Sequence, residues 1–586
     1  MDPSRSSPAT FCRDWHGALA LFVVVVAVFW PATGYDFINY DDPPFVQENP
    51  FVNTGLSWAN LRWAFTAVCE QWWLPVLWIS FMIDAALYGP GPFGFHLTNI
   101  LLHAVNAALL FWILWRLTGF RGQSLFVAAA FALHPLRVES VVWITARKDV
   151  LSGLFFMLAL LAFLWHARRP SPWRMASVAL LMLLGLMSKA ILIILPPILL
   201  LLDYWPLRRA GNPLDRKEWK DWGNLLREKW MLILLAAIFI GINLTTHTTG
   251  RGDTAGLSWT NRLALIPPNY WTYVGKLLWP HPLSIIYPQR EGIAPWLTVF
   301  SLLGLVTTTV VLYRLRNRLP ALIVGWLWFL IALSPSIRGL RMGIGDYADR
   351  FTYLPSIGFF LMVAIAANHL FRNRRQRNTT LALLATVMLA AGAVKTRALL
   401  PIWKDSVSLF EYVRARFPDD PIAYCKLAEH HVQSGHLDEA ERLLLEALRL
   451  HPEHLRAHLQ LANLYAASHR RQQAIDQFRL VPESSPVFPF AANNIAWLLA
   501  THPEATSEDL NEALRVAELA RQASPAPAAQ MFDTLGAVYA ANGRFEEAIA
   551  AAKEARRLAL ENKFTNLAER IARRLSGYES GRAWVE

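Results

Sequence analysis

Long apolar runs separated by short polar loops dominate the first two thirds of the chain. The first run covers residues 17–30, and ten more lie near residues 96–116, 123–134, 150–167, 173–188, 190–202, 230–246, 296–313, 320–336, 353–371 and 379–396. A helix needs about 20 apolar residues to cross a bilayer, and some of these runs are short, but we count each as a span. The pattern predicts an all-α, polytopic membrane bundle of about eleven spans over residues 1–396.

Residues 31 to about 95 contain no run of that length but are rich in tryptophan, including Trp58, Trp63 and Trp78. Amphipathic aromatic segments favour the membrane interface. We therefore expect one or two helices there that lie along the bilayer surface. The stretch 259–279 is also assigned to the interface, because counting it as a lone span would invert the later loops.

Past residue 397 the pattern changes to mixed charged and apolar positions with helical period and a repeat of 34 residues. Large and small residues recur in register in four units, at Tyr424, Leu427, Ala428 and Ala440; at His458, Leu461, Ala462 and Ala474; at Ile495, Ala496, Leu499 and Ala513; and at Phe532, Leu535, Tyr539 and Ala548. An insertion near 501–508 interrupts the third unit, and a helix at about 559–575 would cap the stack. This is the tetratricopeptide period, and such a superhelix binds extended peptide or another protein on its concave face. Unrelated helical hairpins are the alternative for this second domain, residues 397–586.

The net charge of +12 does not indicate nucleic-acid binding, because the basic residues cluster in short loops between apolar runs. Alternate loops are basic, namely those with Arg116 and Arg121, with Arg168, Arg169 and Arg174, with Arg208 through Lys229, with Arg314, Arg316 and Arg318, and with Arg372 through Arg377. The positive-inside rule makes these loops cytoplasmic. An odd span count then places the repeats outside, in the periplasm of a bacterial inner membrane or, alternatively, in the lumen of the endoplasmic reticulum.

Polar residues gather in the loops assigned to the outer face. Asp41 and Asp42 follow the first run, and ionisable groups at a membrane edge usually have a function, although a solvated turn is the alternative. The others are Asp84; His96, Asn99 and His103, on one helical face; His134, Glu139, Arg147, Lys148 and Asp149; Lys276, His281, Tyr287 and Arg290; and Asp346, Asp349 and Arg350. Each alone could be a cap, an anchor or an ion pair. Together they predict a site on that side.

Two kinds of chemistry fit these residues. Asp84, His96 and His103 could hold a metal, but the two histidines lie about two helical turns apart, and Cys12, Cys69 and Cys425 are too scattered to help. A carboxylate with arginine at a membrane edge suits proton abstraction from a nucleophile, with the cation neutralising a phosphate leaving group. A lipid-linked phosphate donor is the natural source of that phosphate.

Short motifs recur in a fixed order along the membrane part of the chain, namely Asn39-Tyr40-Asp41-Asp42, Trp72-Trp73-Leu74-Pro75, His96-Leu97-Thr98-Asn99, His134-Pro135-Leu136-Arg137-Val138-Glu139, Arg147-Lys148-Asp149 and Ala348-Asp349-Arg350-Phe351. Together they resemble the membrane module of the transmembrane and tetratricopeptide-repeat O-mannosyltransferases and their bacterial relatives. The resemblance implies a GT-C glycosyltransferase fold, a polyprenyl-phosphate sugar donor and a catalytic acid in the first outer loop. The sequence departs from the family at Phe95, where relatives often have a second histidine.

These implications assign roles to the candidate residues. Asp41 or Asp42 would be the catalytic base; Arg350, Arg147 and Lys148 would bind the donor phosphate; Asp84, His96, Asn99, His103, Glu139 and Asp349 would support the site. The predicted activity is the transfer of one hexose, such as mannose, with inversion, to a Ser or Thr hydroxyl of a protein recruited by the repeats. It requires no metal, although a divalent ion stays possible. A membrane-anchored peptide-binding scaffold is the alternative. A transporter would need ionisable groups at mid-membrane depth, whereas most lie at span ends.

Overall fold

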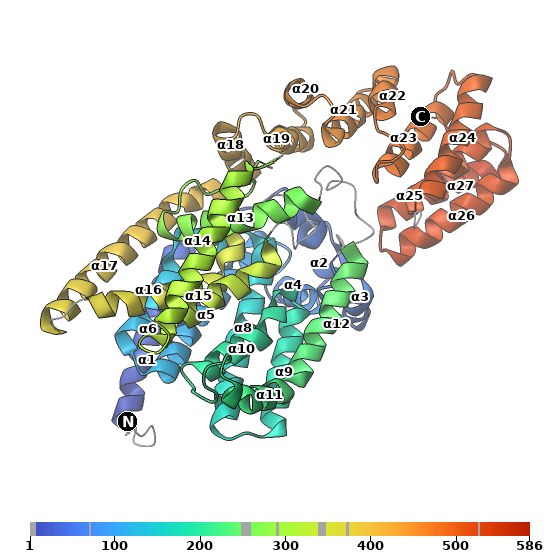
Figure 1. Cartoon of the computed structure of the whole chain (residues 1–586). Coiled ribbons are helices and arrows are strands. Elements are labelled where there is room, and N and C mark those ends of the chain that lie inside the picture. The colour runs from blue at the N-terminus through green and yellow to red at the C-terminus, as the bar shows by residue number, and fades with distance from the viewer. Residues whose placement is uncertain are drawn as a thin grey trace. The chain divides into compact units, whose positions relative to one another are not determined.

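The computed structural model describes residues 8–69, 72–247, 259–288, 292–337, 347–370, 374–524 and 528–585, so Arg290 and Asp346 lie outside the described residues. Within these ranges the chain is helical (Figure 1), and one isolated β-bridge joins Cys69 and Trp72. It forms two compact units, Met1–Leu409 and Phe410–Glu586. The fold is therefore all-α, and each unit is described separately.

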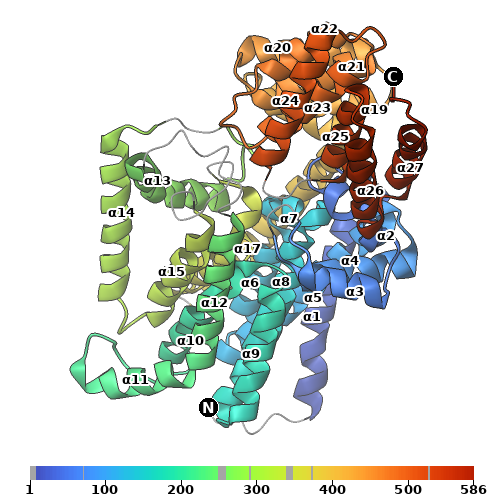
Figure 2. The ribbon, with the colours of Figure 1, turned by 90° about the vertical axis from the view of Figure 1, so that its right-hand side faces the viewer.

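The first unit contains seventeen α-helices among the described residues. They are α1 (Pro8–Phe29), α2 (Pro50–Asn53), α3 (Trp58–Thr66), α4 (Pro75–Tyr88), α5 (Pro92–Thr118), α6 (Arg121–Leu133), α7 (Val138–Val142), α8 (Arg147–Arg168), α9 (Pro172–Leu186), α10 (Leu195–Tyr204), α11 (Trp219–Glu228), α12 (Trp230–His247), α13 (Trp259–Leu278), α14 (Pro295–Arg314), α15 (Pro320–Leu333), α16 (Pro355–Leu370) and α17 (Arg374–Leu399). Short 3-10 or π turns join them, including η2 (Pro43–Gln47), η3 (Pro135–Arg137), η5 (Ala190–Ile194), η8 (Ser334–Ser336) and η9 (Asp349–Thr352). Figure 2 shows the same helices from a second side.

The count of eleven spans is wrong. Among the described residues, five helical segments are long and apolar enough to cross a membrane: Trp15–Gly34, Pro92–Thr118, Ile144–Arg168, Pro295–Arg314 and Asn378–Trp403. A sixth results if Arg121–Leu133 and Pro135–Val142, bent by 56°, form one span. These segments make the chain a multi-pass membrane protein.

The other five apolar runs form helices of 10–17 residues. At 1.5 Å per residue, such a helix is shorter than the hydrocarbon core of about 30 Å. In α15, protein rather than lipid covers much of the apolar surface, since Trp328, Phe329 and Leu333 are buried. Apolar runs therefore overcount spans when some of them build the interior of the bundle.

Helix α5 lies at the centre of the part of the bundle that carries the candidate site. It packs against α1, α4, α6 and α8. Its Asn106 side chain donates to the Val150 carbonyl oxygen at 2.7 Å and to the Tyr353 hydroxyl at 3.0 Å, which joins α5 to α8 and to the start of α16. Helices α15 and α16 meet at Gly325 and Gly358, where a Cβ on either glycine would lie 2.5 Å from the other's carbonyl oxygen. Only glycine permits this approach.

The second unit consists of helical hairpins, preceded by α18 (Ser406–Arg416), which crosses from the first unit. The pairs are α19 (Pro421–Gln433) with α20 (Leu437–Leu450), α21 (Leu455–Ala467) with α22 (Arg471–Arg479), α23 (Phe488–Ala500) with α24 (Ser507–Ala523), and α25 (Ala529–Ala541) with α26 (Phe545–Glu561); α27 (Thr565–Glu579) follows. The tetratricopeptide prediction is confirmed. Ala548, Ala552 and Ala555 are fully buried along one stripe of α26, because only a small side chain lets its neighbours approach.

Candidate active site

The loop after the first span is held by hydrogen bonds that its backbone N–H groups donate within the first unit. The Asp36 backbone N–H donates to the Lys404 carbonyl oxygen at 2.9 Å, and the Asn39 N–H donates to Ser406 Oγ at 2.8 Å. Pro43 opens η2 directly after the acid pair. Hydrogen bonds therefore hold the loop before the acid pair, and η2 begins directly after it. The two neighbouring carboxylates have different surroundings.

Asp42 is fully buried and all its contacts are internal. Its Oδ2 accepts from the Ile38 N–H at 2.8 Å, and its Oδ1 accepts from the Thr145 N–H at 3.0 Å and from the Thr145 hydroxyl. Burial raises the pKa of the Asp42 carboxyl from its usual 3.8 to about 6, and the bonds from Thr145 and Ile38 oppose that rise. The geometry suits a carboxylate that fixes the loop against the start of α8.

Asp41 is the accessible member of the pair. Its side chain is 31% exposed, and its Oδ2 lies 3.3 Å from Lys148 Nζ. The ammonium of Lys148 lies 5.3 Å from the ring centroid of Phe45 and 5.5 Å from that of Trp143. Since a general base must reach the proton it removes, Asp41 rather than Asp42 has the exposure for that role.

Arg350 is held on η9 by Glu139. Its backbone N–H donates to Glu139 Oε2 at 2.8 Å, and its guanidinium forms an ion pair with Glu139 Oε1. Burial lowers the pKa of the Arg350 guanidinium, but the Glu139 carboxylate outweighs that effect, so the pKa lies above its usual value. The guanidinium carbon lies 5.3 Å from the Trp143 ring centroid, the same ring that Lys148 faces. Trp143 thus contacts two cations beside Asp41.

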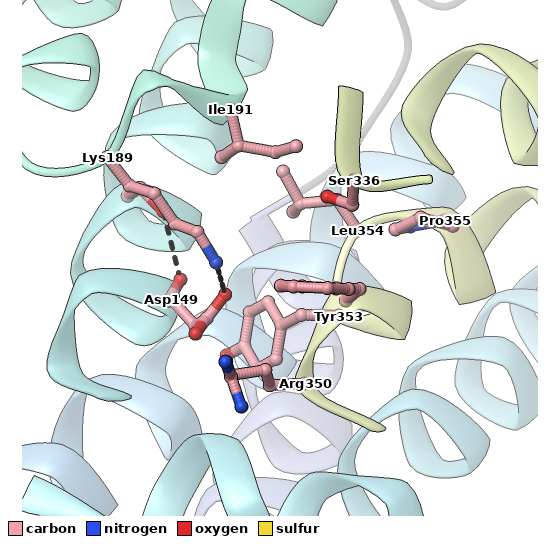
Figure 3. A pocket seen from close by; sticks show the side chains of 10 residues that line it. Asp149, Lys189, Ile191, Ser336, Arg350, Tyr353, Leu354 and Pro355 are labelled. Atoms are coloured by element: carbon pink, nitrogen blue, oxygen red, sulfur yellow. Dashed lines mark hydrogen bonds and ion pairs between the residues drawn. The ribbon is translucent and has the colours of Figure 1, made fainter. Parts of the chain in front are cut away.

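A third cation, Lys189, lies in the loop before η5 and pairs with the Asp149 carboxylate (Figure 3). Burial lowers the pKa of the Lys189 amine and the Asp149 charge opposes this. A pocket here is lined by Asp149, Ser152, Lys189, Ile191, Ser336, Arg350, Phe351, Tyr353, Leu354 and Pro355. Figure 3 shows the Arg350 side chain beside the Lys189 and Asp149 pair. The pocket carries two cations and one carboxylate.

Asp349, next to Arg350, is bound on the other side of η9. Its Oδ1 accepts from Lys276 Nζ at 2.8 Å, its Oδ2 accepts from the Ser284 N–H at 3.2 Å, and the Tyr287 hydroxyl lies within 2.9 Å of both oxygens. Burial, followed by the Asp349 charge, raises the pKa of Tyr287 well above its usual value. These bonds fix η9 and therefore the position of Arg350.

Arg147 forms an internal brace and does not face the pocket. It is fully buried, forms an ion pair with Asp84, and donates from Nε to Asn99 Oδ1 and from Nη2 to the Phe95 carbonyl oxygen, both at 2.7 Å. Asn99 in turn donates to the Trp143 carbonyl oxygen at 3.2 Å. The brace therefore supports the segment that carries Trp143.

His96 and His103 lie in the interior of the bundle. His103 is buried and bonded to the Tyr353 hydroxyl at 2.8 Å and to the Ala132 carbonyl oxygen at 3.0 Å, while His96 is buried in α5. Asp84 accepts from Thr98 Oγ1 at 2.8 Å besides its pair with Arg147. Within the described ranges, no group of three His, Cys, Asp or Glu side chains is placed to hold a metal ion.

The structure thus brings together Asp41, Asp42, Lys148, Glu139 and Arg350, with Asp349 behind them, and it sets Asp84, His96, Asn99, His103 and Arg147 in the supporting interior. Sequence reasoning missed Lys189 as a site residue. A signal existed, because Lys189 is the only charged residue between Arg174 and Asp203.

The fold and the site together define a class of protein. It is an all-α, multi-pass bundle that carries paired carboxylates and cations at one loop cluster and is followed by tetratricopeptide repeats. A family model described as tetratricopeptide repeat matches residues 426–464. The chain is 24% identical over 483 residues to a protein O-mannosyl-transferase of Caenorhabditis elegans, covering 77% of this chain and 66% of that protein. It is 33% identical over 137 residues to protein O-mannosyl-transferase TMTC1 of Mus musculus, covering 21% of this chain and 14% of that protein. The predicted resemblance to the transmembrane and tetratricopeptide-repeat O-mannosyltransferase family is confirmed.

Among solved structures, ArnT from Cupriavidus metallidurans, determined with undecaprenyl phosphate bound, is similar at 13% identity over 88% of this chain and 91% of that one, with a TM-score of 0.35. A likeness of that size does not define a common fold. The chain spans 66% of the length of the worm relative and a small part of the mouse relative.

Proposed function

We propose that this protein is a membrane-integral glycosyltransferase that moves one hexose, such as mannose, from a polyprenyl-phosphate donor to a Ser or Thr hydroxyl of a protein. Two things support the proposal. The first is the sequence similarity to protein O-mannosyl-transferases over 77% of the chain. The second, which carries the most weight, is the partly exposed Asp41 beside Lys148, next to the cations Arg350 and Lys189.

The reaction is a direct displacement at the anomeric carbon. The acceptor oxygen forms a bond to that carbon while the bond from the carbon to the phosphate oxygen breaks, and the Asp41 carboxylate takes the hydroxyl proton. The sugar configuration inverts, and polyprenyl phosphate leaves with the electron pair of the broken bond. A positioned general base contributes about 10²- to 10⁴-fold to such a step.

Lys148, Lys189 and Arg350 are the groups we assign to the donor phosphate. Each is already paired with a carboxylate, namely Asp41, Asp149 and Glu139, so the cations are oriented before the phosphate arrives. Charge-assisted bonds of this kind stabilise the negative charge that develops on the leaving phosphate. Arg147 would then act indirectly, by fixing the backbone near Trp143.

The repeats would recruit the acceptor, since stacked helical hairpins offer a concave surface for extended peptide. The membrane would be a bacterial inner membrane with the repeats in the periplasm. The positive-inside assignment of the basic loops supports this orientation.

The proposal is tested by incubating the purified full-length protein with polyprenyl-phosphate mannose labelled in the sugar, together with a periplasmic extract from cells that lack the protein. We expect label on Ser or Thr residues, located by mass spectrometry, and no label when a sugar nucleotide replaces the lipid donor. Absence of label with every polyprenyl-phosphate hexose would refute the glycosyltransferase proposal and favour a membrane-anchored peptide-binding scaffold.

A further inference from the structure

A second concave feature of the bundle lies apart from the candidate active site. It is a groove of about 420 Å³ between α6, α16, α17 and the end of α13. Its walls are apolar side chains such as Leu133, Phe360 and Leu389, and its lining includes the small residues Ala130 and Gly392. A Cβ on Gly392 would lie 3.4 Å from the Leu133 carbonyl oxygen, so α17 packs closely on the end of α6 at this point. We call this feature the α6–α17 groove.

The polar lining residues share one end of the α6–α17 groove. His134 follows the last residue of α6, and its Nε2 is bonded to the Leu277 carbonyl oxygen at 3.2 Å. Lys395 lies near the C-terminal end of α17, with its Nζ 5.7 Å from the ring centroid of Trp279, whose side chain is 73% exposed. No acidic residue occurs among the described residues that line the groove. The polar end therefore carries a positive charge and an exposed tryptophan.

This arrangement matches an anionic lipid. Helix α17 belongs to a candidate span of which only 11% is buried, and it lies at the edge of the bundle (Figure 1). The groove is therefore open to bilayer lipid along its apolar length. Tryptophan favours the headgroup level of a membrane, so Trp279 places the Lys395 ammonium where a lipid phosphate would be.

The α6–α17 groove is separate from the pocket that we assign to the sugar donor. Helix α16 stands between them, since Leu354 and Pro355 line the pocket while Phe359 and Phe360 line the groove. Helix α15 packs on one side of α16 and α6 on another. Arg350 lines the pocket and not the groove, and Lys395 lines the groove and not the pocket.

We propose that the α6–α17 groove binds an anionic glycerophospholipid, with its phosphate at Lys395 and an acyl chain between α6, α16 and α17. The bound lipid fills the space on the open side of α17. It thereby holds α17 against the end of α6, where the Thr396 hydroxyl donates to the Leu133 carbonyl oxygen at 2.9 Å. The proposal does not depend on glycosyl transfer, and its readout is lipid binding alone.

The test uses native mass spectrometry of the delipidated full-length protein in detergent, titrated separately with phosphatidylglycerol, phosphatidylcholine and polyprenyl phosphate. We expect phosphatidylglycerol to bind at least fivefold more tightly than phosphatidylcholine. Lys395→Gln should remove that preference, and Ala391→Phe, which fills the groove and keeps the charge, should weaken both phospholipids at least fivefold. Lys404→Gln is the matched control, because Lys404 is an exposed lysine nine residues further on that does not line the groove.

Two results would overturn the proposal. The first is an equal affinity for phosphatidylglycerol in Lys395→Gln and Lys404→Gln. The second is tight binding of polyprenyl phosphate that displaces phosphatidylglycerol and is lost in Lys395→Gln, because the groove would then be a donor site. A thermal shift measured with each lipid shows whether each variant is folded.

Discussion

The burial of Asp42 predicts that this residue makes the protein less stable as the pH rises. Its carboxylate has no solvent contact, and its partners are the Ile38 N–H and the N–H and hydroxyl of Thr145. Asp42→Asn keeps the size of the side chain and removes the charge. The new Nδ2 cannot accept from the Ile38 N–H, which costs about 1–3 kcal/mol at every pH. The part of the stability difference that changes with pH is the cost of ionising the buried Asp42 carboxyl, which the variant does not have.

The magnitude of that term follows from the pKa. The folded-state pKa of Asp42 is about 6, above its usual value of 3.8. Between these values the unfolded chain loses the proton first, so the wild-type protein loses stability as the pH rises through this range. At about 1.4 kcal/mol per pH unit, the total is about 3 kcal/mol, absent below about pH 4 and complete above about pH 7.

The assay is unfolding in mixed micelles, followed by tryptophan fluorescence at several pH values from 4 to 7.5. Its midpoints give the difference in free energy of unfolding between Asp42→Asn and wild type at each pH. We expect the variant to gain about 3 kcal/mol relative to wild type across that range. Glu48→Gln changes an exposed acid of the same loop. Its difference from wild type in free energy of unfolding should not change with pH. A flat or opposite slope for Asp42→Asn would refute the assignment of Asp42 as a buried, destabilised carboxylate.

Three further predictions concern other parts of the chain. Lys189→Met should raise the KM for the polyprenyl-phosphate donor at least tenfold in steady-state kinetics, and an unchanged KM would remove Lys189 from the phosphate site. Arg147→Ala leaves Asp84 buried without its cation and should lower the free energy of unfolding by about 3–5 kcal/mol; a loss below 1 kcal/mol would show that the brace is dispensable. Ala552→Leu overfills the seam of α26 and should lower the free energy of unfolding by about 1–3 kcal/mol. Ala550→Leu, at an exposed position of the same helix, should leave it unchanged. Equal effects at both positions would contradict the packing account.

The helical class and the repeats could be predicted because both depend on local periodicity. The spans could not be counted in the same way. The run at 320–336 is as apolar as a true span, yet α15 in this run is only 14 residues long and buries Trp328 and Phe329 against protein. Hydropathy does not show whether lipid or protein covers an apolar face, and only the three-dimensional packing decides that question.

The site could be located from the sequence but its internal division of roles could not. Asp41 and Asp42 are adjacent and chemically alike, and their difference arises from Thr145, which lies 103 residues further along the chain. Likewise, the pairing of Arg147 with Asp84 depends on how α4 packs against α5 and α8. Arg147 and Lys148 are neighbours in one motif, but the backbone turns one inward and the other toward Asp41.

The central claim is that Asp41 removes the acceptor proton during sugar transfer. The most direct measurement is the single-turnover rate of transfer from labelled polyprenyl-phosphate mannose, compared among wild type, Asp41→Asn and the exposed-loop control Glu48→Gln, with each protein shown to be folded by its unfolding midpoint. Loss of a general base predicts a fall of about 10²- to 10⁴-fold for Asp41→Asn and a rate near wild type for Glu48→Gln. A rate for folded Asp41→Asn within about twofold of wild type would contradict the claim.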